Sequence, residues 1–329
     1  MPVCFLFLGF LILTEKWSTP LRYPADMTPP PGRLVDVGGR RLHLDEKGHG
    51  SPLVVFEAGI AASSVSWCLV RDRVAQFTST AAYDRAGLGW SDSGIGIKTA
   101  EDAAGDFFRL LESAGIGSPV VLVGHSFGGL ICRIFQQRFP GMVGGMVLVD
   151  PVVRAEWRGA TEPKLRMLGR GASLSRRGAT LARLGVVGVA LKLLVSGSGR
   201  IPKLLAKLSA GNGAPVADRL VGEVRKMPRE LWPVVAEHWS QSKSFEAMAA
   251  NLESLPVSVE QLDEGQSLGD LPLVVLTASK RVSEHEADAG LSSRGEHVQV
   301  PGAGHWLQLD APDVVSAAVL RVVEQVRAG

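Results

Sequence analysis

Short apolar runs bounded by turn residues alternate with amphipathic segments along most of the chain. Five runs have the length and composition of strands buried on both faces. They occupy residues 53–56, 120–123, 142–149, 273–276 and 297–300. Between the first two, residues 100–114 place Phe107, Leu110 and Leu111 on one helical face, and Thr99 with Asp102 forms a capping box at the start. This alternation predicts an α/β fold with a mostly parallel sheet flanked by helices.

Three parts of the chain depart from this alternation of strand and helix: its start, its end and a long stretch before the penultimate strand. Residues 33–37 and 41–45 alternate in polarity around Gly38 and Gly39, which predicts an antiparallel hairpin at one edge of the sheet. A final helix is predicted over residues 312–327. Residues 152–270 are too many for an ordinary crossover and include helical patterns at 181–195 and 230–239, so a helical cap inserted before the penultimate strand is expected.

These patterns divide the chain into four parts. Residues 1–32 are a hydrophobic N-terminal segment with a proline-rich linker, and residues 33–151 form the first part of the core. Residues 152–270 form the cap and residues 271–329 the second part of the core. The apolar run at residues 3–13 is too short to span a membrane and suits a signal peptide, but no basic residue precedes it. A truncated anchor fits equally well, so a cytoplasmic, membrane-associated or exported location stays open.

Composition excludes several classes of protein. With 46% hydrophobic residues, 21% charged residues and a net charge of +2, the chain is expected to fold compactly and not to bind nucleic acid. Cys4, Cys68 and Cys132 are far apart and have no metal-ligand spacing, so no metal or other cofactor is expected. Residues 161–210 hold ten Lys and Arg residues against one acid, which indicates either a solvated basic face or a surface for anionic lipid or an acidic partner.

One apolar run leads directly into a candidate nucleophile. Residues 120–123 are followed by Gly124, His125, Ser126, Phe127 and Gly128, and then by a helical pattern. Glycines on both sides of a serine allow the sharp strand-to-helix turn that exposes the hydroxyl group. The helix N-terminus also favours negative charge that develops there. A phosphate-binding turn is the alternative, but it lacks the expected lysine.

A serine hydroxyl needs a base, and His305 is the best-placed histidine. It lies on a glycine-containing loop after the strand predicted at 297–300 and before the last helix. His125 occupies the variable position of the serine motif and His297 is expected within a strand. The other histidines are read as surface or satisfied polar groups: His43, His49, His238 and His285.

At these residues the chain resembles the α/β-hydrolase family, from Arg33 to the C-terminus apart from the insertion. The segment FEAGIAASSVSW resembles the family's His-Gly segment, with Gly59 kept and Ala58 in place of the histidine. The segment YDRAGLGWSD, residues 83–92, resembles the family's D-x-x-G-x-G-x-S loop beside the site and is taken as architectural support. The resemblance implies an oxyanion hole formed by the backbone N–H groups of Ile60 and Phe127.

The third member of the triad departs from the common family pattern. Where family members usually carry an acid after the penultimate strand, this chain has Lys280 and Arg281. Asp150 follows the preceding strand, 24 residues after Ser126, a spacing similar to that of the haloalkane-dehalogenase-like branch. Asp150 is therefore the leading candidate to orient His305. The alternative acids are Glu284, Glu286 and Asp288.

Together these residues predict a serine hydrolase that acts on a carboxylic ester, lactone or thioester with a small apolar acyl or alkyl group. A serine nucleophile disfavours epoxide hydrolysis through an alkyl-enzyme ester. A non-catalytic binding or interaction protein, an acyltransferase and a perhydrolase remain open alternatives. Association with a membrane through the N-terminal segment or the basic cap also remains open.

Overall fold

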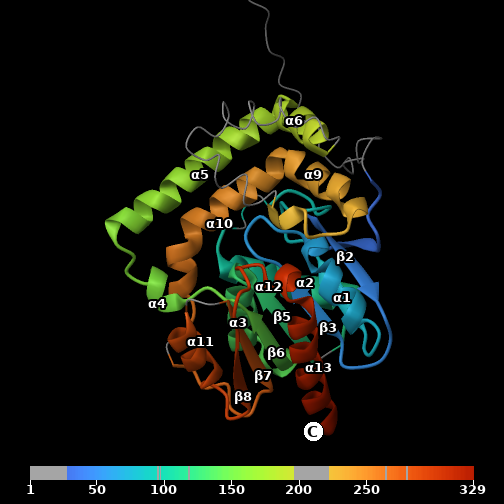
Figure 1. The fold of residues 1–329 in the computed structure, drawn as a ribbon, viewed down its shortest axis with the longest axis vertical. Coiled ribbons are helices and arrows are strands. Elements are labelled where there is room, and N and C mark those ends of the chain that lie inside the picture. The colour runs from blue at the N-terminus through green and yellow to red at the C-terminus, as the bar shows by residue number, and fades with distance from the viewer. Residues whose placement is uncertain are drawn as a thin grey trace, which may run out of the picture.

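The computed structural model describes residues 28–94, 96, 98–117, 119–195, 222–263, 265–278 and 281–329. The apolar run at residues 3–13, Cys4 and Lys280 lie outside the described residues. The predicted α/β architecture is confirmed by an eight-stranded sheet with the strand order β1-β2-β4-β3-β5-β6-β7-β8 (Figure 1). The strands are β1 Arg33–Asp36, β2 Arg41–Lys47, β3 Val54–Glu57, β4 Thr80–Tyr83, β5 Val120–His125, β6 Val143–Val149, β7 Leu273–Ala278 and β8 Gly295–Val300.

The predicted hairpin forms the antiparallel edge of the sheet. Strands β1 and β2 pair antiparallel, and β2 pairs antiparallel with β4. All other neighbours are parallel, including β5 with β6 and β6 with β7. The carboxyl ends of β3 to β8 therefore lie along one edge, where α/β sheets bind ligands.

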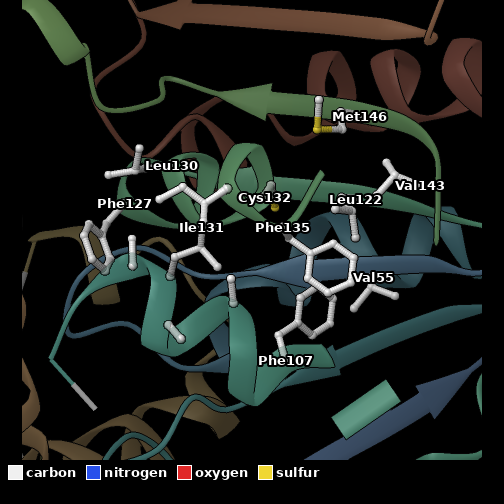
Figure 2. Packing of buried hydrophobic residues seen from close by; sticks show 14 of the residues in the cluster. Val55, Phe107, Leu122, Phe127, Leu130, Ile131, Cys132, Phe135, Val143 and Met146 are labelled. Carbon is white, nitrogen blue, oxygen red and sulfur yellow. The ribbon is translucent and has the colours of Figure 1, made fainter. Parts of the chain in front are cut away.

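Successive apolar side chains of the central strands point to opposite faces of the sheet and form two cores. One core packs β-strand residues such as Val55 and Leu122 against α2 (Ala100–Ala114) and α3 (Phe127–Arg138), and Figure 2 shows Phe107 and Phe135 within it. The opposite core packs Val54 and Val121 against α1 (Cys68–Val74) and α13 (Pro312–Ala328). Strands β3, β5, β6 and β7 are thus buried on both faces, as their apolar runs predict. The same prediction is wrong for residues 297–300, because β8 lies at the edge of the sheet and only Val300 of that strand is buried.

The remaining helices lie in the connections. Between β6 and β7 the structure describes α4 Arg154–Trp157, α5 Glu162–Arg183, α6 Val186–Val195, α9 Trp232–Ser240 and α10 Ser242–Glu260. Near the end of the chain are α11 Val282–Ala289 and α12 Leu307–Asp310, and the short 3-10 turns are η1 Ser64–Trp67, η2 Pro140–Met142 and η4 Arg229–Leu231. Helices α5, α6, α9 and α10 gather on one side of the sheet, at the top of Figure 1. No helix in the described part of the chain is long and apolar enough to cross a membrane.

One predicted helix is wrong. The pattern at 181–195 is not a single helix, because α5 ends at Arg183 and α6 begins at Val186. Gly185 between them has φ of +76°, a left-handed conformation that ends a helix. Apolar spacing continued across this break, so periodicity alone could not reveal it.

Candidate active site

Ser126 occupies a strained turn between β5 and α3. Its φ and ψ are 54° and −117°, a conformation that non-glycine residues seldom adopt. The turn is fixed from both sides, since the Ser126 N–H donates to the Val149 carbonyl at 3.0 Å and the Ser126 carbonyl accepts from Gly129 at 3.0 Å. A Cβ atom at Gly128 would lie 2.5 Å from the Glu57 carbonyl oxygen, so only glycine allows this close packing against β3.

His305 and Asp150, which lie 155 residues apart in the sequence, are joined by a hydrogen bond. His305 Nδ1 lies 2.5 Å from Asp150 Oδ2. The other carboxylate oxygen accepts a hydrogen bond from the Ala278 N–H at 3.0 Å. This pair of contacts fixes the carboxylate, and it leaves His305 Nε2 available because the imidazole is half exposed.

The alternative acids are engaged elsewhere or exposed. Asp288 pairs with the buried Arg133 at 3.1 Å, and Glu284 accepts a hydrogen bond from Ser283. Among the described residues, neither of these carboxylates nor that of Glu286 forms a hydrogen bond or ion pair with His305. Arg281, which follows β7 where the common family acid is expected, pairs with Glu156 of α4.

His125 contributes to the site in a way that the sequence did not reveal. Its buried Nε2 donates to the His305 carbonyl at 2.8 Å, and the two rings lie 4.7 Å apart. Burial lowers the pKa of His125 to about 3, so its imidazole is neutral. The residue before the serine thus holds the backbone of the histidine loop, although the hydroxyl of Ser126 forms no hydrogen bond with His305 in the structure.

Ile60 and Phe127 lie on two backbone segments that meet at Ser126. A Cβ atom at Gly59 would lie 3.5 Å from Ser126 Cβ and 2.9 Å from His125 Nδ1, which shows how closely the loop after β3 approaches the turn. Neither the Ile60 N–H nor the Phe127 N–H donates to another described residue. Both groups are therefore available to a negatively charged oxygen at this edge.

Arg85 fixes the loop that carries Ile60. Its guanidinium donates to the Glu57 carboxylate and to the carbonyl oxygens of Ala58 and Gly59, the last at 2.6 Å. Arg85 and Glu57 are both buried, and Tyr83 also donates to Glu57. Arg85 lies in the segment YDRAGLGWSD, which the sequence analysis took only as architectural support. The resemblance of that segment to a family loop beside the site was the one sequence feature that pointed to it. The structure gives it a direct hold on the loop backbone.

Asp84 anchors the same loop from its other end. Its carboxylate accepts from the Ser64 N–H at 2.6 Å and from the Trp90 N–H at 3.0 Å, and it pairs with the buried His43 at 2.9 Å. Burial alone would raise the pKa of Asp84, but the hydrogen bond and charge of His43 outweigh it and lower that pKa to about 2. A Cβ atom at Gly89 would overlap the carboxylate, so the chain can wrap around Asp84 only with glycine there.

Helices α9 and α10 contact these loops from above. His238 Nδ1 lies 3.0 Å from the Ser63 hydroxyl, and the Trp239 indole N–H donates to the Ala61 carbonyl at 3.2 Å. Lys243 donates to the Gly89 carbonyl at 2.9 Å. Burial lowers the pKa of His238 to about 4 and that of Lys243 to about 8. The segment between β6 and β7 is therefore docked on the site's own loops.

Apolar and aromatic side chains surround this junction. Trp306, which follows His305, packs with the buried Leu309 and Met227. Trp232 and Trp239 of α9 belong to the same cluster. Within the described residues there is no group of three or more His, Cys, Asp or Glu side chains that could hold a metal ion.

Comparison with known proteins agrees with this architecture. A model of the alpha/beta hydrolase family matches residues 49–318. Over 135 residues the chain is 32% identical to the 2-(acetamidomethylene)succinate hydrolase of Mesorhizobium japonicum. That match covers 40% of this chain and 48% of the relative. The chain spans between 18% and 48% of the length of this and three other curated relatives that it matches.

Solved structures share the fold at low sequence identity. An epoxide hydrolase from Vigna radiata has a TM-score of 0.65 at 18% identity and covers 89% of this chain and 97% of its own. A thermophilic esterase from Thermogutta terrifontis has a TM-score of 0.59 at 18% identity and covers 87% of this chain and 94% of its own. Since the family model extends over most of the sequence, the protein belongs to the alpha/beta hydrolase family.

Proposed function

We propose that the protein is a serine hydrolase that cleaves a carboxylic ester, lactone or thioester through an acyl-enzyme on Ser126. The single observation that carries the proposal is the hydrogen bond of 2.5 Å between His305 Nδ1 and Asp150, formed at the same sheet edge as the strained Ser126 turn. An imidazole held in this way keeps Nε2 as the acceptor for a hydroxyl proton.

The reaction would proceed in two halves. Ser126 Oγ attacks the carbonyl carbon while His305 takes its proton, and the N–H groups of Ile60 and Phe127 donate to the oxyanion. Collapse of the tetrahedral intermediate breaks the bond to the leaving oxygen or sulfur, which receives the proton from His305. Water then attacks the acyl-enzyme with His305 again as base, which releases the acid and restores Ser126. Asp150 stabilises the imidazolium in both halves.

The side chain of residue 126 separates this chemistry from that of its structural neighbours. Epoxide opening through an alkyl-enzyme ester needs a carboxylate nucleophile, whereas a hydroxyl group suits acyl transfer. The chain has serine there, and its α3 N-terminus offers the free N–H of Phe127. These features favour an acyl substrate even though an epoxide hydrolase shares the fold.

The surroundings support a small apolar acyl or alkyl group as part of the substrate. Trp306 adjoins His305, and Trp239 reaches the Ala61 carbonyl beside Ile60. Aromatic and aliphatic side chains favour apolar ligands through burial of nonpolar surface. We expect hydrolysis rates of p-nitrophenyl esters to rise from acetate toward longer chains and then fall, and a flat series would contradict an apolar acyl site.

The decisive test combines labelling with matched carboxamide substitutions. A fluorophosphonate probe should label the wild type and not Ser126→Ala. Asp150→Asn should lower kcat by about 1,000- to 10,000-fold, because an amide cannot stabilise the imidazolium. Glu284→Gln, which neutralises an exposed acid of α11, is the matched control and should change kcat less than twofold, a difference of about 0.4 kcal/mol in the barrier.

Three other outcomes of these assays would change the proposal. Equal activity in wild type and Asp150→Asn would reject Asp150 as the orienting acid. Failure of the probe to label a folded wild type would reject an activated serine and favour a non-catalytic binding protein. Labelling without ester hydrolysis, together with acyl transfer to an added alcohol or peroxide, would favour an acyltransferase or perhydrolase.

A further inference from the structure

Helix α5, the outermost helix between β6 and β7, exposes three large apolar side chains to solvent. Helix α5 packs on α10 through a buried stripe formed by Leu168, Ala172, Ser175 and Ala179 (Figure 1). Its opposite side faces away from the rest of the molecule. Six large apolar side chains are exposed in the described part of the chain, and five of them belong to α5, α6 or the turn that joins them. These five are Leu165, Met167, Leu174, Leu184 and Val189, and the sixth is Val257.

Four of the five arginines of α5 divide into two sets by direction, and the fifth, Arg166, pairs with Glu162 of the same helix. Arg176 and Arg183 pair with Glu253 and Glu246 of α10 and so lie along the inner flank. Arg170 and Arg177 are exposed and form no ion pair with any residue that the structure describes. Within the described part of the chain, no carboxylate neutralises the positive charge of these two side chains.

Helical spacing places the free arginines beside the exposed apolar groups. Residues seven apart are nearly in line because seven residues complete almost two turns. Arg170 and Arg177 consequently form one row, and Met167 with Leu174 forms a second row directly beside it. We call these four side chains the outer face of α5. Methionine at 56% exposure and leucine at 37% exposure lie next to guanidinium groups on this face.

We propose that the outer face of α5 binds the surface of a bilayer that contains anionic phospholipids. Arg170 and Arg177 contact phosphate groups, for which the guanidinium fork is well matched. Met167 and Leu174 enter the boundary between headgroups and acyl chains, as the apolar side of an interfacial amphipathic helix does. Residues 161–210 hold ten Lys and Arg residues against one acid, which suits an extended anionic surface, and the adjacent apolar row suits insertion below the headgroups, so the combination favours lipid. This inference is independent of the chemistry at Ser126.

The test measures cosedimentation of the full chain with vesicles of phosphatidylcholine, with and without phosphatidylserine at about 30 mol %. Wild type should bind the anionic vesicles more strongly, and added salt should weaken that binding. The variant R170Q/R177Q should bind them roughly 30-fold more weakly, since each arginine near an anionic surface contributes about fivefold. The variant R176Q/R183Q is the matched control, because it removes two arginines from the same helix on the flank that faces α10. It should bind within about threefold of wild type.

A second pair of substitutions tests the apolar row. The variant M167S/L174S should bind at least about tenfold more weakly, because two partly inserted side chains are lost. Circular dichroism and thermal unfolding of every variant check that the fold is intact. Equal losses in R170Q/R177Q and R176Q/R183Q would show dependence on net charge alone and overturn the proposal. Unchanged binding of M167S/L174S would also overturn it and would favour an acidic protein as the partner of this face.

Discussion

Replacing Arg85 by methionine tests the idea that a buried arginine holds the loop that carries Ile60. The wild-type guanidinium donates to the Glu57 carboxylate and to the carbonyls of Ala58 and Gly59. Methionine fills much of the same apolar volume but donates nothing. Glu57 then keeps the Tyr83 hydroxyl and the Ala58 backbone N–H as neutral donors, and two buried carbonyl groups lose a partner.

The magnitude follows from the burial of the pair. The Arg85 and Glu57 side chains are 6% and 2% exposed, so solvent does not screen them. Removing one partner of a buried ion pair costs about 3–5 kcal/mol in the free energy of unfolding. Because burial already raises the pKa of Glu57, its carboxyl group can take up a proton in the variant, which limits the loss to this range. Displacement of the Ile60 N–H should also lower kcat for ester hydrolysis roughly 100-fold.

Arg71 offers a matched control for the stability part. Its buried guanidinium, on α1, pairs with Asp45 of β2 at 2.5 Å. Urea unfolding followed by tryptophan fluorescence should show similar losses for Arg85→Met and Arg71→Met, whereas only Arg85→Met should lose kcat. The double variant E57Q/R85M should regain part of the stability, because no buried charge is left unpaired. A loss below about 1 kcal/mol in Arg85→Met, or equal loss of kcat in both single variants, would refute the reasoning.

Three further predictions rest on separate contacts. Gly59→Ala places a Cβ atom 2.9 Å from His125 Nδ1, so we expect at least about tenfold loss of kcat in a steady-state ester assay, and full activity would show that the loop can shift freely. Since burial lowers the pKa of His238 to about 4, the fold loses about 3 kcal/mol as pH falls from 6.5 through 4. His238→Gln should reduce this loss in urea titrations at pH 7 and pH 4, and an unchanged pH dependence would contradict it. Thr99→Ala removes the side-chain acceptor of the capping box with Asp102 and should cost about 1 kcal/mol, which an unaltered melting temperature would disprove.

The spacing of apolar residues predicted the elements whose apolar face is regular along the sequence. It missed the elements that form only through contact with distant parts of the chain. The capped helix at 100–114 is confirmed residue for residue, because its cap and its apolar face are both local. Strand β4 was not predicted, since its short TAAY sequence becomes a strand only by lying between β2 and β3. Helix α5 was recognised only at its end. Its glycines weaken a helical pattern, yet Gly178 is needed because a Cβ atom there would lie 2.6 Å from the Phe245 ring.

The candidate site shows the same division. Ser126 and His305 were proposed from the sequence because each follows an apolar strand at the edge where such sheets place their functional loops. His125 and Arg85 were not, because their importance lies in bonds to backbone carbonyls of loops distant in the sequence. Composition and spacing carry no information about which carbonyl group a buried donor will reach.

The arrangement of the strands explains how Asp150 reaches His305. Strands β6 and β7 are parallel neighbours, so their carboxyl ends lie side by side. Asp150, at the end of β6, donates its N–H to the Leu276 carbonyl and accepts from the Ala278 N–H, both of β7. These bonds hold the Asp150 carboxylate over the end of β7, where it reaches His305 on the loop after β8. The proposal that Asp150 orients His305 therefore needs no acid after β7, where Arg281 pairs with Glu156 of α4.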